Sequence, residues 1–210
     1  MDISNRQQVL DVVAKAVTEC GTPDLLLNSA GIALPCEFVS SKFEDFDRVM
    51  QVNLYGTRHV CEAIVPFMVE RGQGRIVLVG SMASHIAIYG YTNYATSKFA
   101  VRGFAEALRY ELKPLGISEQ LLCPGEVSTP MVAEEHKTMH PATWALKKTA
   151  GTVSVDVPVA DLLKGIHSNK QLIFTGGTSR FMFWANRLTP PSLWYAYCDS
   201  LVKGALDKMR

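Results

Sequence analysis

The stretch RIVLVGSMASHIAIYGYTNYATSK, residues 75–98, decides the fold. Its first part, Arg75–Gly80, is a short and almost continuously apolar run, which is typical of a strand covered on both faces. A loop of small and apolar residues then leads into Asn93–Leu112, which has the amphipathic pattern of a helix. A strand followed in this way by a helix is the repeating unit of a parallel sheet with helical crossovers.

The same alternation extends in both directions from this stretch. Further runs predict strands at Asp24–Asn28, Glu119–Cys123 and Gln171–Thr175. Amphipathic segments predict helices at Arg6–Glu19, Phe43–Arg71 and Val157–Ser168. Pro66 lies inside the second of these helices, so we expect a kink or break near it. The pattern predicts a doubly wound, Rossmann-like α/β fold with three layers, formed by residues 1–210 as a single domain.

Two segments depart from the alternation. Residues 126–155 are polar and poorly periodic, which predicts a loop with short helices that serves as a lid over a substrate. Residues 178–210 combine aromatic and basic side chains, and three interpretations stay open: packing in the core, closure of a substrate pocket, or contact with a membrane surface. Gly176-Gly177, just before this C-terminal tail, predicts a turn.

Composition excludes several classes of protein. Lys and Arg number 21 against 20 Asp and Glu, so no net charge favours nucleic acid. The five cysteines are scattered without a CxxC pair, which argues against a disulfide framework or zinc site and suits the cytoplasm. His136 and His140 lie beside Glu134 and Glu135, but no further ligand cluster accompanies them. We therefore expect a solvated surface there and no metal site.

The candidate chemistry begins with Tyr94 and Lys98. Spacing of four residues places both side chains on one helix face. A phenol has a pKa of about 10, and a nearby ammonium lowers it, so the pair is either an acid/base or two ordinary residues of a helix surface. Ser81 follows a strand, where a parallel sheet places its ligand crevice; it either holds a substrate carbonyl or caps the turn. Asn53 interrupts an apolar pattern, as a buried hydrogen-bonded amide also would.

These residues occur together with two further motifs, Asn28-Ser-Ala-Gly31 and Pro124-Gly125-x-Val127-x-Thr129. In this order and spacing they resemble the short-chain dehydrogenase/reductases, closely over residues 2–131 and in general layout beyond. The resemblance implies NAD or NADP as cofactor and interconversion of a hydroxyl and a carbonyl on a small-molecule alcohol or ketone. The stretch Ser97–Arg109 also resembles bacterial members of the family and lipid- or steroid-type keto reductases. Together with the aromatic tail, this favours an apolar substrate.

The resemblance also implies roles for single residues. Tyr94 would transfer the proton, Lys98 would lower its pKa and bind the nicotinamide ribose, Ser81 would position the carbonyl, and Asn53 would anchor a water. The cofactor-binding residues would follow the dinucleotide from end to end: Asp2 and Ile3 at the adenine, Asn28, Ala30 and Gly31 along the ribose, Pro124 and Gly125 beneath the nicotinamide, and Val127 and Thr129 at its carboxamide.

The sequence departs from the family pattern at its beginning. The first strand and the Thr-Gly-x-x-x-Gly-x-Gly loop are missing, and with them the residue that selects NAD or NADP. We expect an N-terminally truncated fold, either a fragment of a longer protein or a shortened relative, that alone binds cofactor poorly and leaves the edge of Asp24–Asn28 open. A homo-oligomer would form through Phe43–Arg71 and Asn93–Leu112. The rival to an enzyme is a non-catalytic scaffold that keeps the family shape for oligomerisation.

Overall fold

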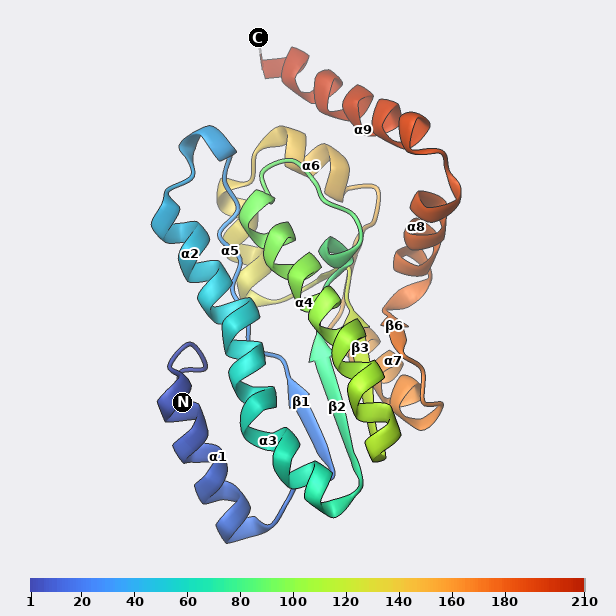
Figure 1. Cartoon of the computed structure of the whole chain (residues 1–210). Coiled ribbons are helices and arrows are strands. Elements are labelled where there is room, and N and C mark those ends of the chain that lie inside the picture. Colours follow the sequence, from blue (N-terminus) through green and yellow to red (C-terminus); the bar gives the residue numbers. More distant parts are fainter. Residues whose placement is uncertain (210) are drawn as a thin grey trace.

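A four-stranded parallel sheet lies at the centre of the computed structural model, which describes residues 1–209 (Figure 1). Its strands, in spatial order, are β1 (Leu25–Asn28), β2 (Gly74–Val79), β3 (Ile117–Cys123) and β6 (Leu172–Phe174). Each neighbouring pair is parallel. The α/β class and the parallel Rossmann-like sheet predicted from the sequence are confirmed.

Side chains alternate between the two faces of the sheet and give the fold its layers. Ile76 and Leu78 of β2 pack in one apolar cluster with α3 (Thr57–Arg71) and α4 (Thr92–Leu112). Val77, between them in sequence, packs on the opposite face against Leu162 of α7 (Asp156–His167). Helix α1 (Arg6–Cys20) lies beside α3, where Val9 is fully buried. Apolar residues on both faces of β2 explain why its sequence shows no polar alternation.

The long segment Phe43–Arg71 is irregular at a different place from the one predicted. It consists of α2 (Phe43–Met50), a π-helical turn at Gln51–Gly56, and α3. Pro66 lies inside α3, and the helix continues through it, so a break at the proline is excluded, while the alternative of a kink stays a prediction. Ile64 and Met68, on either side of Pro66, are both buried in the main core, and this packing holds the helix in place across the lost backbone hydrogen bond.

The segment 126–155 forms short elements above the carboxyl ends of the strands (Figure 1). They are β4 (Glu126–Val127), α5 (Pro130–Thr138), α6 (Pro141–Lys147) and β5 (Thr152–Val153), and β4 pairs with β5 in parallel. Single-turn 3-10 helices occur elsewhere at Phe38–Ser40, Met82–Ser84, Lys113–Leu115 and Asp207–Met209.

The C-terminal tail is helical. Helix α8 (Gly176–Leu188) begins directly at Gly176, so the turn predicted there is wrong; the positive φ of 69° at this glycine lets the chain enter the helix without a longer loop. Helix α9 (Pro191–Leu206) packs against α6. Phe183 of α8 is buried against Phe174, whereas Phe181 and Tyr195 are largely exposed. No helix among residues 1–209 is both long enough and apolar enough to cross a membrane.

Strand β1 forms one edge of the sheet. Within the described chain it pairs only with β2. Leu26 packs toward α1 and α3, but Leu25 and Leu27 point to the other face and remain 40% and 46% exposed. An open edge beside exposed leucines is the arrangement that the sequence predicted for Asp24–Asn28.

Candidate active site

A mostly apolar cavity of about 450 Å³ opens where β2 and β3 end. Eight of the residues predicted to act or to bind cofactor line it: Gly31, Ser81, Tyr94, Lys98, Pro124, Gly125, Val127 and Thr129. The carboxyl edge of a parallel sheet is the usual ligand crevice of such folds. Folding therefore brings together residues that are spread over a hundred positions of the sequence.

Tyr94 lies in the first turn of α4, and burial is the main influence on its hydroxyl. Burial raises the pKa of Tyr94 to about 12, although contact with the Ser81 side chain opposes the shift. We expected Lys98 to lower this pKa. In the structure the Lys98 ammonium lies 5.6 Å from the centre of the Tyr94 ring and donates to the Val79 carbonyl at 2.9 Å. The net shift is opposite to the expected one, and Tyr94 carries its proton at neutral pH.

Lys98 is itself strongly affected by its surroundings. Burial lowers its pKa to about 8, because the charged form loses hydration. Its single hydrogen bond to Val79 leaves two N–H groups of the ammonium available. Gly31 lies close by: a Cβ atom at that position would be 3.5 Å from the Lys98 nitrogen.

Asn53 connects three segments around the cavity. Its side chain accepts from the Ile32 amide at 2.8 Å and donates to the Ile32 carbonyl at 2.9 Å. It also donates to the Ser97 hydroxyl at 2.9 Å, and Ser97 in turn donates to the carbonyl of Tyr94. Asn53 thus fixes the chain after β1 against the first turn of α4. This accounts for its complete burial in the π-helical turn.

Other predicted cofactor residues do not line the cavity. The Asn28 amide is buried and donates to the Thr57 hydroxyl at 3.0 Å. Asp2 accepts from the Ser4 amide and hydroxyl, which lowers the Asp2 pKa, and Ile3 packs against Gly56. Ala30, although next to Gly31, does not line the cavity either. The adenine role of Asp2 and Ile3 and the ribose role of Asn28 and Ala30 stay predictions.

The Pro124–Thr129 motif crosses the opening of the cavity. The Gly125 amide donates to the Thr175 hydroxyl at 3.2 Å, and a Cβ atom on Gly125 would lie 2.7 Å from the Ser179 hydroxyl. A side chain at Gly125 would therefore require the Ser179 side chain in α8 to move. The Thr129 hydroxyl accepts from the Val132 amide at 3.3 Å and so caps α5 while it faces the cavity.

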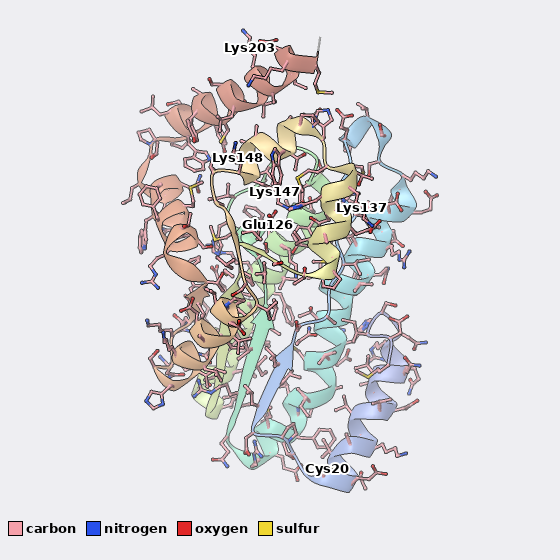
Figure 2. The ribbon with its side chains drawn as sticks, turned by 180° about the vertical axis from the view of Figure 1, so that it is seen from behind. Cys20, Glu126, Lys137, Lys147, Lys148 and Lys203 are labelled. Carbon is pink, nitrogen blue, oxygen red and sulfur yellow. The ribbon has the colours of Figure 1, made fainter. Side chains whose placement is uncertain are left out.

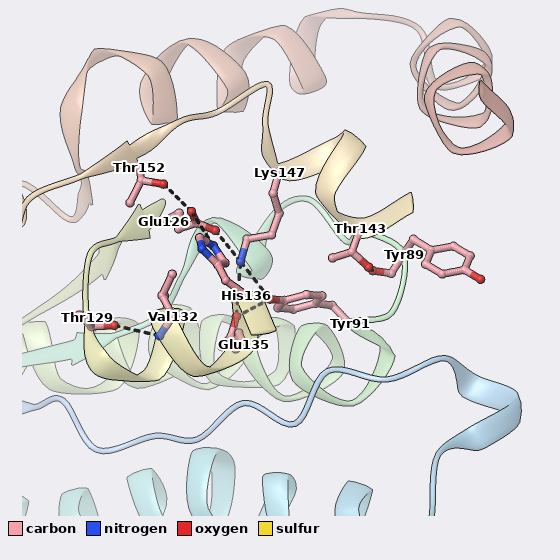
Figure 3. A network of polar contacts seen from close by, with 10 residues as sticks. All are labelled: Tyr89, Tyr91, Glu126, Thr129, Val132, Glu135, His136, Thr143, Lys147 and Thr152. Carbon is pink, nitrogen blue, oxygen red and sulfur yellow. Dashed lines mark hydrogen bonds and ion pairs between the residues drawn. The ribbon is translucent and has the colours of Figure 1, made fainter. Parts of the chain in front are cut away.

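A polar cluster in the cavity wall was missed by sequence reasoning. Tyr91, Glu126, Glu135 and Lys147 line the cavity together (Figure 3). We expected Glu134, Glu135 and the nearby histidines to form a solvated surface. That is wrong for Glu135, which is buried because α5 turns this face toward the Tyr91 hydroxyl; Glu134 is exposed. Among residues 1–209 no group of three or more His, Cys, Asp or Glu side chains is arranged to hold a metal ion.

The sequence of this chain matches a known protein family. The family model described as short chain dehydrogenase matches residues 1–140. The chain belongs to this family. The short-chain dehydrogenase match extends from α1 to the end of α5, and it therefore includes every residue predicted to act in this cavity.

Relatives within the family include two reductases and a hydroxysteroid dehydrogenase. The 3-dehydrosphinganine reductase of Danio rerio is 40% identical over 144 residues, which are 69% of this chain and 43% of that protein. The 3-ketodihydrosphingosine reductase of Bos taurus is 33% identical over 165 residues, 78% of this chain and 50% of the relative. Human 17-beta-hydroxysteroid dehydrogenase 13 is 34% identical over 83% of this chain and 56% of its own length. The chain therefore spans about half the length of the curated relatives it matches.

Solved structures give the same fold. A gluconate 5-dehydrogenase from Burkholderia cenocepacia, in complex with NADP and tartrate, superposes with a TM-score of 0.76 at 26% identity. The match covers 86% of this chain and 73% of that one. A second short chain dehydrogenase of the same organism gives a TM-score of 0.79 at 21% identity, which supports the fold alone.

Proposed function

We propose that this protein is an NAD- or NADP-dependent oxidoreductase that reduces the carbonyl group of an apolar small molecule. The observation that carries the proposal is a protonated, half-buried tyrosine, Tyr94, beside Ser81 in a mostly apolar cavity. The names of the relatives, which include reductases of sphingoid ketones and a steroid dehydrogenase, support an apolar substrate.

The residues present fit a nicotinamide nucleotide. Gly31 and Gly125 keep the cavity floor free of side chains, and the Lys98 ammonium has N–H groups available beside Gly31. We assign Gly31, Lys98, Val127 and Thr129 to the nicotinamide half of the cofactor, since all four line the cavity. When bound, the nicotinamide supplies the hydride that reaches the carbonyl carbon.

The chain's own residues supply the proton. The Ser81 hydroxyl donates a hydrogen bond to the substrate oxygen and so orients the carbonyl toward Tyr94. As negative charge develops on that oxygen, the Tyr94 phenol transfers its proton there, because the developing alkoxide is a stronger base than the phenolate. The raised pKa of Tyr94 keeps this proton in place at neutral pH, which favours reduction over oxidation.

Segment 126–155 is proposed to be the lid of this site. It supplies Glu126, Val127, Glu135 and Lys147 to the cavity wall, above the strand ends. The start of α8 closes the cavity further, with Ser179 and Met182.

Two surface roles complete the proposal. Phe99 and Tyr110 of α4 are exposed apolar side chains on a long helix, and we assign this face to a homo-oligomer. Phe181, Trp184 and Tyr195, exposed near Arg180 and Lys203, are assigned to contact with a membrane surface. Sedimentation velocity tests the homo-oligomer, and a monomer would contradict it. Flotation with anionic liposomes tests the membrane contact, and protein that stays at the bottom of the gradient would contradict it.

The proposed activity is tested with the longest open reading frame that contains this sequence. Oxidation of NADPH and NADH is followed spectroscopically with tetradecan-3-one and, for comparison, with a short sugar acid. We expect turnover of the long ketone only. Binding of either dinucleotide is measured by calorimetry on the same protein. Absence of both binding and turnover would contradict the enzyme and favour the non-catalytic scaffold.

A further inference from the structure

Two lysines line the cavity, and their side-chain nitrogens are held in different ways. Lys147, the last residue of α6, is held by charged and polar partners (Figure 3). Its nitrogen lies 2.6 Å from Glu126 Oε2 and 3.4 Å from Glu135 Oε2, and it donates a hydrogen bond to the Tyr91 hydroxyl at 3.0 Å. Among residues 1–209, the nitrogen of the other lysine, Lys98 in α4, forms no ion pair.

The Lys98 nitrogen is open to the cavity on one side. Among residues 1–209 its one hydrogen bond is the donation to the Val79 carbonyl at 2.9 Å. A Cβ atom at Gly31 would lie 3.5 Å from this nitrogen, so the glycine leaves room beside it, and the centre of the Tyr94 ring is 5.6 Å away. The bond to Val79 uses one N–H group, so the lone pair of the neutral amine is free to face the cavity.

The surroundings of Lys98 favour this neutral amine. Burial lowers its pKa to about 8, and Cys123, behind it in β3, opposes the shift only in part. Burial keeps the neighbouring Tyr94 protonated, and the carboxylates across the cavity are engaged by Lys147. With a pKa of about 8, roughly a tenth of Lys98 is unprotonated at pH 7, against less than about one in a thousand for an ordinary exposed lysine.

The cavity around Lys98 can admit and orient a carbonyl compound. A lysine that loses its hydration in an apolar pocket is a nucleophile toward carbonyl carbon. Ser81 and Tyr94 line the same cavity and offer hydroxyl groups to a carbonyl oxygen. Much of the remaining wall is apolar and includes Ile86 and Met182, so the molecule that brings the carbonyl should carry an apolar chain.

We propose that Lys98 is a covalent modification site, at which an aldehyde with an apolar chain forms an imine. The lone pair of the amine forms a bond to the aldehyde carbon, the electron pair of the C=O π bond moves to oxygen, and one N–H proton passes to that oxygen. The C–O bond of this carbinolamine then breaks, and its hydroxyl leaves as water with the second N–H proton. The step needs neither an oxidant nor a reductant. The adduct would fill the space beside Gly31.

The imine is trapped in the 210-residue chain with octanal and sodium cyanoborohydride, which reduces it to a stable secondary amine, and the labelled lysines are mapped by mass spectrometry. At pH 7 we expect Lys98 to be labelled at least about tenfold faster than Lys147 and than the exposed Lys15, because its larger share of free amine outweighs its restricted access. Its labelling rate should level off above about pH 8, whereas the rate of an ordinary exposed lysine rises toward about pH 10.

Matched variants and a polar aldehyde complete the test. Lys98→Arg keeps a positive charge but removes the nucleophile, so the fast labelling should vanish, whereas Lys147→Arg should retain it. Glyceraldehyde in place of octanal should show no preference for Lys98, and neither should octanal with the chain unfolded in guanidinium chloride. Labelling of Lys98 no faster than Lys147 in the folded wild type, fast labelling that persists in Lys98→Arg, or an equal preference with glyceraldehyde would overturn the proposal. No cofactor or turnover enters the measurement, so its outcome is independent of the proposed reductase activity.

Discussion

The two walls of the cavity are held in different ways. Ser81 and Tyr94 belong to the end of β2 and the start of α4, whose Ile76, Leu78 and Val101 are buried in the main apolar cluster. The opposite wall, segment 126–155, contributes no described residue to the three apolar clusters of the sheet. It is held instead by the ion pairs of Lys147 with Glu126 and Glu135. The residues proposed for proton transfer therefore lie on elements packed in the core. The proposed lid depends on charged contacts, and two of the residues that make them, Glu126 and Lys147, are labelled in Figure 2.

The largest effect is expected when the proposed proton donor, Tyr94, is removed. Tyr94→Phe should lower kcat by roughly 10²-fold or more, the usual size of acid/base catalysis, while the fold stays intact. Tyr110→Phe on the same helix is the control, because Tyr110 is exposed. Steady-state reduction of tetradecan-3-one measures both variants. Turnover close to wild type in Tyr94→Phe would remove Tyr94 from its role.

The lid wall should respond to charge rather than to loss of apolar contact. Lys147→Met leaves the buried carboxylates of Glu126 and Glu135 without their ammonium, which is costly in a site of low hydration. Amide exchange in α5 and α6 should rise by tenfold or more, while exchange in β2 stays unchanged. The control is Lys148→Met, because Lys148 is the exposed neighbour (Figure 2). Equal amide exchange in the two variants would mean that the ion pairs of Lys147 do not hold segment 126–155.

Low pH should reduce the local stability of segment 126–155 in the wild type. The pKa of Glu126 is lowered in the folded chain, so its contribution to stability is present above the unfolded value of 4.5 and is lost as pH falls through the folded pKa. Exchange in α5 and α6 should therefore increase below about pH 4.5, by up to tenfold, before β2 and β3 become exposed. The pH dependence should disappear in Glu126→Gln. A transition shared by all elements at one pH would contradict separate stability of the two walls.

The smallest effect is expected where the walls meet, at Thr129. Thr129→Val would remove the hydrogen bond proposed between Thr129 and the nicotinamide, worth about 1 kcal/mol, so dinucleotide affinity should fall about fivefold. Because the Thr129 hydroxyl also caps α5, Thr129→Ser serves as control and should keep both the cap and the affinity. Calorimetry with NADPH and with adenosine monophosphate gives the comparison. Equal loss for the mononucleotide would place the contact elsewhere.

The sequence predicted the residues of the first wall and the place of the second, but not the charged contacts within the second, for physical reasons. Tyr94, Lys98 and Ser81 were found because a helix repeat and a strand end place them by local rules. Glu135 was assigned to solvent since no local pattern distinguishes it from Glu134 in a polar segment. Its partners Glu126 and Lys147 meet it only through the tertiary structure. The net pKa shift of Tyr94 was likewise unpredictable, because burial outweighs the effect of Lys98 and burial is not visible in spacing.

The π-helical turn at Gln51–Gly56 has a consequence for insertions and deletions. A π turn contains one residue more than the α turn it replaces, so it sets α3 out of phase with α2 by roughly 100°. This offset lets Asn53 reach Ile32 on one side of the helix while Thr57 meets Asn28. Deletion of a single residue within the turn would restore a continuous α-helix and rotate one of these contacts out of reach. The extra residue thus sets the register in which the helix contacts both the end of β1, at Asn28, and the chain that follows it, at Ile32.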